Sequence, residues 1–230
     1  MKCEIIPRLE DLPDPRLYLE DKSIFVIIDV LRFSTTVVYL LKAGATYLKP
    51  CTEKEEAFSF KKRYNNSLLV GEAAGQSIKG FDFNNSPSAI EGLDLSRKKV
   101  AIRTSNGTRA ISMIDADKTL YVGSTINAKA LGLHLREQHQ TRPIYLIAVG
   151  RAGKKAIEDK VGAIMIRASC LGETLDLGTL KTFRQLIRNS PSAKRIKKLG
   201  YGKDVEKALE FYSSTIIPVL KGGVIVNGSD

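Results

Sequence analysis

Short apolar runs alternate with amphipathic or polar stretches along most of the chain. The clearest run covers residues 24–29 and is rich in β-branched residues, which is typical of a strand buried on both faces. Further strands are predicted at residues 46–49, 68–70, 100–103, 120–122, 144–149 and 224–226. Helices are predicted around residues 34–44, 53–64, 108–114, 126–139, 156–171, 179–189, 192–198 and 203–213.

Strands that alternate with helices predict the α/β class. We therefore expect a mixed or largely parallel sheet with helices on both faces, in three α/β/α layers. The chain contains no Pro/Ser-rich linker, low-complexity tract or clear repeat, so residues 1–230 are expected to form a single unit. The segment from about 173 to 230 is helix-rich and basic, and a C-terminal subdomain there stays open as an alternative.

The composition excludes several protein classes. Hydrophobic residues make up 43% of the chain and charged residues 27%, which is typical of a globular protein rather than a disordered or fibrous one. The longest apolar stretch, residues 24–31, is interrupted by Asp29 and is too short to cross a bilayer. The three cysteines are widely spaced and form no CxxC motif. We expect a soluble, reduced, cytoplasmic protein without a membrane partner or signal peptide.

The formal net charge of +11 is concentrated in one segment. Between Lys181 and Lys207, nine Lys or Arg residues face only Asp204 and Glu206. A solvated helix face is the preferred interpretation, and a polyanion contact or a lid over an anionic ligand is the alternative. No aromatic platform or zinc finger accompanies the charge, so we expect no nucleic-acid partner.

Polar residues follow most of the predicted strands. In open α/β sheets, ligands bind beyond the carboxyl ends of the strands, where helix N-termini also point. Carboxylates, hydroxyls and amides at such an edge suit a hard cation and a phosphate. Each residue alone is more often a helix cap, but together they favour an anion site. The residues in question are Asp29, Glu72, Thr104, Ser105, Asn106, Ser124, Thr125, Gly150 and Arg151.

Two segments are the most informative. Asp29 ends a buried strand, where a carboxylate needs a partner or a metal ion, and an ion pair with Arg32 is the alternative that leaves no site. The haloacid dehalogenase pattern fails because Leu31 stands where it needs a second Asp. The second segment is Gly71 and Glu72 followed by residues 80–87; a long loop with a capped exit is the alternative, but a loop of this length favours a functional role. Its Ser86 is predicted as the N-cap of a helix, and Asn84 suits a left-handed turn.

Two further turns carry candidate chemistry. The turn 104–109 offers backbone amides that can cradle an oxyanion, and an ordinary capped turn is an equal alternative. The loop 150–155 carries three cations and precedes Glu158 and Asp159, but it lacks the Walker pattern. The two histidines, His134 and His139, lie on a polar helix and are expected to be exposed, so a His-rich zinc site is excluded.

These motifs occur in an order that resembles a known family. The segments 29–36, 72–87, 106–110 and 150–159 are similar to those of the 2-phosphosulfolactate phosphatases of coenzyme M biosynthesis, which are magnesium-dependent acid phosphatases. The resemblance spans roughly residues 23–172, with weaker agreement around 200–204 and Pro218. It implies one phosphatase unit that uses Mg²⁺ and hydrolyses a sulfonated phospho-acid to sulfolactate and phosphate.

The chain departs from the family pattern at two places. Asn84 replaces a glycine, and Arg103 precedes Thr104 and Ser105 where the family has a Thr-rich run. The extra arginine affects which anion is preferred. Two alternatives therefore stay open: a phosphatase for a different phospho-hydroxy acid, and a non-catalytic basic protein that binds polyanions.

The resemblance also implies roles for single residues. Asp29 is expected to act as nucleophile or metal ligand, and Arg151, in a loop flanked by glycines, is expected to bind the non-reacting end of a small anionic phosphorylated substrate. A homodimer is kept open. The expected catalytic residues are Asp29, Glu158 and Asp159, and the expected metal ligands are Asp29 and Glu72. The expected substrate-binding residues are Arg32, Ser34, Thr35, Asn85, Ser86, Asn106, Gly107, Thr108 and Arg151.

Overall fold

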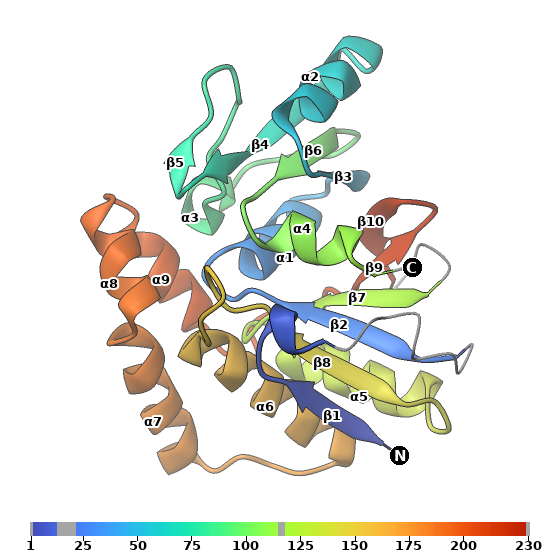
Figure 1. Ribbon diagram of the computed structural model, residues 1–230, viewed down its shortest axis with the longest axis vertical. Helices are drawn as coiled ribbons and strands as arrows, with labels where there is room; N and C mark the ends of the chain where they lie inside the picture. The colour runs from blue at the N-terminus through green and yellow to red at the C-terminus, as the bar shows by residue number, and fades with distance from the viewer. Residues whose placement is uncertain (1, 13–21, 115–117, 229–230) are drawn as a thin grey trace.

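The computed structural model describes residues 2–12, 22–114 and 118–228, and these residues form one ten-stranded mixed sheet with helices on both faces (Figure 1). The strand order is β1-β8-β2-β7-β9-β10-β3-β6-β4-β5. The strands are β1 (Cys3–Ile6), β2 (Ile24–Ile28), β3 (Tyr47–Cys51), β4 (Ser67–Ala73), β5 (Gln76–Ser77), β6 (Lys99–Arg103), β7 (Thr119–Gly123), β8 (Ile144–Ala148), β9 (Pro218–Lys221) and β10 (Val224–Asn227). The expected α/β class and layered architecture are confirmed.

The helices alternate with the strands as the sequence pattern indicates. A short 3₁₀ helix, η1 (Leu9–Asp11), follows β1. The α-helices are α1 (Phe33–Lys42), α2 (Lys54–Arg63), α3 (Pro87–Ile90), α4 (Gly107–Ser112), α5 (Ala128–Gln138), α6 (Ile157–Leu171), α7 (Leu177–Arg188), α8 (Pro191–Lys198) and α9 (Gly202–Ala208). In the described part of the chain, no helix combines the length and the hydropathy that crossing a membrane requires.

The sheet consists of two parallel groups joined by an antiparallel hairpin. Strands β1, β8, β2 and β7 run parallel to one another, and so do β3, β6 and β4. The hairpin β9–β10 pairs with β7 on one side and with β3 on the other, antiparallel in both cases. The C-terminal segment therefore contributes to the middle of the sheet as well as the basic helices α7–α9.

Strand β2 separates two hydrophobic cores. All five of its residues are buried, because helices cover both faces of the sheet at this position. Ile24, Val26 and Ile28 pack in one core with residues of α5, α6 and α7–α9. Phe25 and Ile27 pack in the other core with residues of α1 and α4. This alternation follows from the period of two in a strand and explains why the sequence run is continuously apolar.

The carboxyl ends of the two strand groups meet although three antiparallel pairings separate the groups. Adjacent strands are rotated by about 20–25° on average, so the six pairings from β2 to β4 accumulate roughly 120–150° of twist. This rotation turns the end of β4 back toward the end of β2. The residues that follow β2, β4, β6 and β8 consequently share one edge of the molecule.

Three strands were not predicted from the sequence: β1, β5 and β9. The expectation that both histidines are exposed is also wrong. The Tyr121 hydroxyl lies 3.1 Å from Nε2 of His134 and 2.9 Å from Nε2 of His139, and both rings are half-buried. Burial lowers the pKa of both histidines, that of His139 to about 4.

Candidate active site

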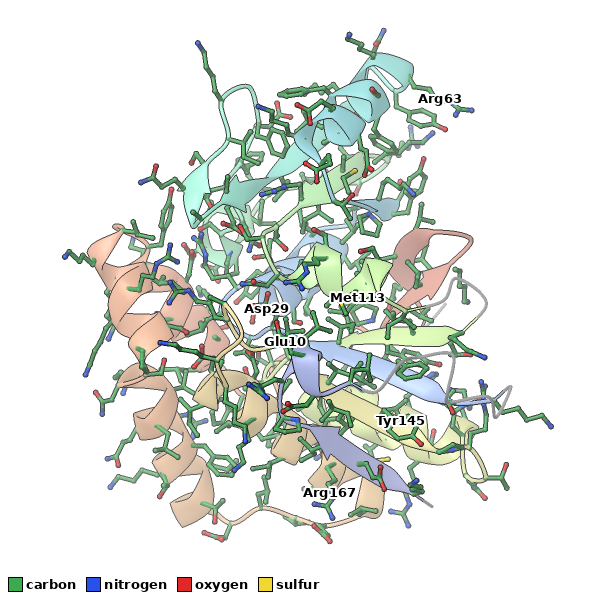
Figure 2. All side chains as sticks on the ribbon, in the orientation of Figure 1. Glu10, Asp29, Arg63, Met113, Tyr145 and Arg167 are labelled. Atoms are coloured by element: carbon green, nitrogen blue, oxygen red, sulfur yellow. The ribbon has the colours of Figure 1, made fainter. Side chains whose placement is uncertain are left out.

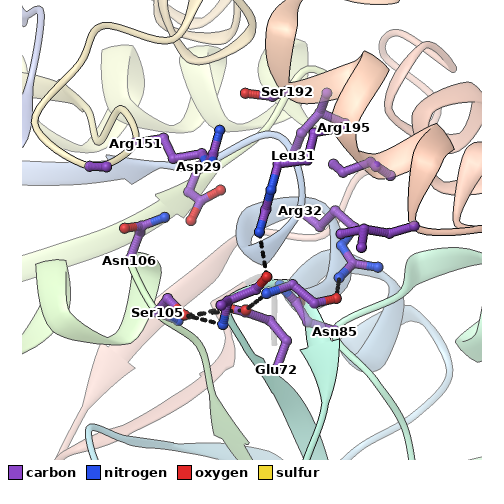
Figure 3. Close-up of a pocket in the computed structure, with 15 residues that line it drawn as sticks. Asp29, Leu31, Arg32, Glu72, Asn85, Ser105, Asn106, Arg151, Ser192 and Arg195 are labelled. Atoms are coloured by element: carbon purple, nitrogen blue, oxygen red, sulfur yellow. Dashed lines mark hydrogen bonds between the residues drawn. The ribbon is translucent and has the colours of Figure 1, made fainter.

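A cavity of about 250 Å³ lies where the carboxyl ends of β2, β4, β6 and β8 meet α8 (Figure 3). Asp29 lies between the two strand groups, near the middle of the molecule in Figure 2. Of the nine residues grouped at strand ends from the sequence, five line this cavity, whereas Thr104, Ser124, Thr125 and Gly150 do not. The lining residues are Asp29, Leu31, Arg32, Glu72, Ala74, Gly75, Asn85, Ser105, Asn106, Arg151, Ala152, Ser192, Arg195, Ile196 and Leu199.

Asp29 is a buried carboxyl that forms no salt bridge within the described residues. The residue is 7% exposed. Ser34 fixes its backbone, because the Ser34 Oγ accepts a hydrogen bond from the Asp29 amide at 2.9 Å. Burial, and then the negative charges of Glu72 and Glu158, raise the pKa of Asp29 to about 7. An acid in this environment binds a proton or a cation more readily than an exposed one.

Arg32 does not neutralise Asp29, so the internal ion pair considered from the sequence is wrong. Its Nη1 instead pairs with Oδ2 of Asp204 at 2.8 Å, and its Nη2 donates to Oδ1 of Asn84 at 2.9 Å. The guanidinium also lies over the ring of Tyr201 at 4.5 Å. Asn84 does not have a positive φ, so the left-handed turn expected there is absent and the residue acts through its side chain.

Glu72 is held in place by the loops around it. Its Oε1 accepts from the Ser105 amide at 2.6 Å, and its Oε2 accepts from the Ser105 hydroxyl at 3.2 Å and from the Gly75 amide. The turn that supplies Gly75 has positive φ at Ala74 (51°) and at Gly75 (88°). Every one of these donors fixes the Glu72 carboxylate at the cavity wall without adding a positive side chain.

Glu158 and Asp159 lie in the first turn of α6, each 2% exposed, behind the residues that line the cavity. Asp159 accepts from the Val30 amide at 2.8 Å and from the Gly150 amide at 2.9 Å. It thereby ties together the loops that follow β2 and β8. Burial, Asp29 and Glu158 raise the pKa of Asp159 well above its usual range. The Oε2 atom of Glu158 is buried with no hydrogen-bond partner in the described part of the chain.

Several hydroxyls expected at the substrate instead hold the loops together. Thr35 donates to the Val30 carbonyl at 2.8 Å and contacts Ser124. Thr108 donates to the Thr104 carbonyl at 2.8 Å. None of the three expected hydroxyl residues of these two loops, Ser34, Thr35 and Thr108, lines the cavity. Each is fully or almost fully buried, and their hydroxyl groups form hydrogen bonds with the backbone of these loops.

Ser86 and Gly107 also shape the site from behind. Ser86 is the N-cap of α3, as predicted, and its hydroxyl donates to Asp204 at 2.7 Å. Gly107 is the first residue of α4, and a Cβ there would lie 2.2 Å from the Phe33 ring. Only a glycine lets α4 approach α1 this closely, which brings the neighbouring Asn106 to the cavity.

The oxygen atoms at this site fit a hard cation. Besides the carboxylates of Asp29 and Glu72, the Oδ1 atom of Asn85 is buried without a partner within the described residues. No three His, Cys, Asp or Glu side chains in these ranges are placed to enclose a metal ion. Mg²⁺ commonly uses one or two carboxylates together with water and substrate phosphate, so a smaller donor set is sufficient for it. Zinc would prefer Cys or His ligands.

Arg195 is a site residue that the sequence argument missed. It lies on α8 and lines the cavity beside Ser192 and Ile196, so the interpretation of its segment as a solvated face is wrong for this residue. Lys194 and Lys197 are exposed, as expected. The missed signal is helical phase, because residues 192, 195, 196 and 199 share the apolar face of α8.

Comparisons with known proteins identify the family of the chain. Residues 11–223 match the family model of 2-phosphosulpholactate phosphatase. The chain is 33% identical to the 2-phosphosulfolactate phosphatase of Methanocaldococcus jannaschii, over 81% of this chain and 84% of the relative. It is 30% identical to a probable 2-phosphosulfolactate phosphatase of Clostridium tetani, over 98% of this chain and 100% of the relative. The chain therefore belongs to the 2-phosphosulpholactate phosphatase family.

Proposed function

We propose that this protein hydrolyses 2-phosphosulfolactate, a phosphate monoester of a sulfonated hydroxy acid, to sulfolactate and phosphate. The observation that carries the proposal is the cavity itself, which is lined by the buried acids Asp29 and Glu72 and by Arg151 and Arg195. Acids that attract a cation and arginines that attract anions suit a substrate with both a phosphate and a second acid group. The relatives from Methanocaldococcus jannaschii and Clostridium tetani are named for the same activity.

The cofactor that we propose is Mg²⁺, held by the carboxylates of Asp29 and Glu72. Asn85 supports this assignment through its unpartnered Oδ1. When bound, the ion supplies positive charge to the phosphate oxygens and to the charge that develops in the transition state. Burial and the charges of Glu72 and Glu158 raise the pKa of Asp29, so a cation beside this carboxylate would stabilise its ionised form.

The remaining residues bind the substrate and handle protons. Asn106 at the cavity wall is proposed to donate to the phosphate, and Arg151 to bind the non-reacting acid group. The Oε2 atom of Glu158 is buried without a partner in the described residues, and the charge of Glu158 raises the pKa of Asp29. We therefore propose Glu158 as the general base that accepts the proton released by the attacking group. Asp29 acts either as a nucleophile or as a ligand of the cation, and both roles require its ionised form.

A different phosphorylated hydroxy acid is the second candidate substrate. Arg103, the residue that suggested it, is not among the residues that line the cavity, and its Nη1 donates to the Glu72 carbonyl at 2.8 Å. A cytoplasmic location and a homodimer also stay predictions.

The decisive experiment measures phosphate release by the purified chain from 2-phosphosulfolactate, a plain phospho-hydroxy acid and an aryl phosphate. We expect turnover with Mg²⁺, loss of turnover in EDTA and recovery when Mg²⁺ is restored, without a requirement for zinc. Full turnover in metal-free buffer contradicts the proposed cofactor. Absence of turnover on every substrate, together with salt-sensitive retention on nucleic acid, supports a polyanion-binding protein instead.

A further inference from the structure

We infer that Arg195 of α8 is a specificity-determining residue that binds, together with Arg151, a non-phosphorylated acid group of the substrate, its carboxylate or its sulfonate. The inference rests on the proposed function and deepens it. It also gives a role in the site to the basic C-terminal helices, for which a solvated face was the preferred interpretation from the sequence.

Arg195 is seated in the cavity wall rather than extended into solvent. Its Nη2 donates to the carbonyl of Ala74, and Figure 3 shows the side chain reaching from α8 to this turn. A Cβ on Gly75 would lie 3.1 Å from Nη1 of Arg195. The turn after β4 therefore packs directly against the guanidinium and limits the directions in which its other donors point.

The same turn organises both charges of the site. The Gly75 amide donates to Glu72, while the Ala74 carbonyl accepts from Arg195 and the Gly75 carbonyl accepts from Arg32 at 3.3 Å. Two consecutive residues thus fix an acid on one side and two guanidinium groups on the other. A ligand in the cavity meets separate cation-binding and anion-binding sides, which defines its orientation.

The charges of Arg151 and Arg195 are not neutralised by carboxylates. No salt bridge involves either side chain in the described residues, whereas Arg32 is paired with the buried Asp204. Burial and the nearby charge of Arg151 lower the pKa of Arg195, and Glu72 raises it without forming a salt bridge. Crowded guanidinium groups without an acid partner are stabilised when an anion binds between them.

The ligand that fits this arrangement is a small acid with a carboxylate or a sulfonate in addition to its phosphate. A guanidinium donates two parallel hydrogen bonds to such a group, which a lysine ammonium cannot do. Because Asp29 and Glu72 repel anions, a carboxylate or sulfonate is directed to the arginines, and the phosphate is left for the cation. Arg195 therefore discriminates by the second acid group, not by the phosphate.

The test compares Arg195→Gln, Arg195→Lys and Lys197→Gln, the last being an exposed position on the same helix. For Arg195→Gln we expect kcat/KM on 2-phosphosulfolactate to fall by roughly a hundredfold, with less than about a threefold change on an aryl phosphate. Arg195→Lys should recover only part of the loss, and Lys197→Gln should match the wild type. Equal losses on both substrates, or no loss on either, overturn the inference.

A binding measurement separates this inference from the proposed function. Calorimetric titration with sulfolactate, which carries no phosphate, should show binding to the wild type and at least about tenfold weaker binding to Arg195→Gln. If the wild type releases no phosphate but sulfolactate binding still depends on Arg195, the proposed function fails and the inference stands. If sulfolactate binds both proteins equally or neither, the inference fails. Arg195→Lys provides the same comparison if the glutamine variant does not fold.

Discussion

Asp29 combines two properties that separate it from every surface acid of the chain: it is buried, and its nearest charged neighbours include two further acids. Ser34 bonds to its backbone, and its carboxylate lines the cavity and accepts a backbone hydrogen bond from Phe33. A substitution that keeps an oxygen for this bond therefore tests the charge of the carboxylate.

Replacing Asp29 by Asn keeps the size of the side chain and removes the charge that a nucleophile or a cation ligand needs. We expect the turnover number to fall at least roughly a hundredfold, because removing a positioned catalytic group commonly costs this much. Glu55→Gln, in the exposed part of α2, is the matched control and should have wild-type activity. Near wild-type turnover by folded Asp29→Asn protein would remove Asp29 from the reaction centre.

The raised pKa of Asp29 predicts a pH-dependent effect on stability in metal-free buffer. The folded chain keeps the Asp29 proton up to about pH 7, whereas the unfolded chain loses it near the ordinary value of about 3.8. The folded state therefore binds more protons between these values, and stability falls as the pH rises through this interval. Each pKa unit corresponds to about 1.4 kcal/mol, so the loss is at most roughly 4 kcal/mol.

Urea unfolding in EDTA at pH 5 and pH 8 measures this effect. Asp29→Asn has no carboxyl to ionise, so its stability relative to the wild type should increase from pH 5 to pH 8. Mg²⁺ at pH 8 should stabilise the wild type more than the variant. A constant difference between the two proteins across the pH range would show that the Asp29 pKa is not raised.

At the scale of elements, the close approach of α4 and α1 sets the width of the site. Gly107→Ala places a Cβ against the buried Phe33 ring, so we expect the free energy of unfolding to fall by about 1–3 kcal/mol through overpacking. Gly202→Ala is a matched control, since Gly202 also begins a helix and its nearest atom, Cγ of Lys197, lies at an ordinary 3.5 Å. Chemical denaturation of both variants measures the difference, and equal stabilities would contradict the packing argument.

The elements differ in how far the sequence predicts them. The helices and the buried strands were recognisable because their apolar residues follow a period or form a continuous run, as in β2. Strands β1 and β9 have only four residues each, and β9 begins with a proline, so neither has a clear local signal. Their strand conformation is set by partners far away in the chain, Ile144 for β1 and Leu120 for β9 among them.

The site was predictable to a similar extent. Asp29, Glu72 and Asn106 each follow a predicted strand, so the rule for ligand sites at strand ends grouped them. That the ends of β2 and β4 meet across the antiparallel hairpin depends on the twist of the whole sheet, which the pattern does not show. For Arg195 the helical phase of α8 indicates only that it lies on the inward face, and its place in the cavity depends on how α8 packs on the rest of the molecule. The pairing of Arg32 with Asp204 spans 172 positions in sequence and likewise depends on tertiary structure.

For the whole molecule, that pair connects the loop after β2 to α9. Asp204 is fully buried and accepts from Arg32, Ser86 and Ser88, so Asp204→Asn leaves a buried guanidinium without its counter-charge. We expect stability to fall by about 3–5 kcal/mol.

The control for this variant is Glu206→Gln, two positions later on α9. It removes the exposed pair of Glu206 with Arg188, whose side chains are 54% and 46% exposed, and should cost less than about 1 kcal/mol. Denaturant midpoints of the two variants provide the comparison. A small effect of Asp204→Asn would mean that the connection between α9 and the β2 loop does not depend on this charge.

The position of the β9–β10 hairpin has a consequence for biosynthesis. The hairpin follows all other described strands along the chain, yet it separates β7 from β3 in the sheet. At about 5–20 residues per second, roughly 5–20 s pass between the emergence of β7 and that of β10 from the ribosome. During this interval the nascent chain exposes two strand edges that can pair with other chains. The cavity draws Asp29 from one strand group and Glu72 from the other, so it forms only after translation has reached the hairpin.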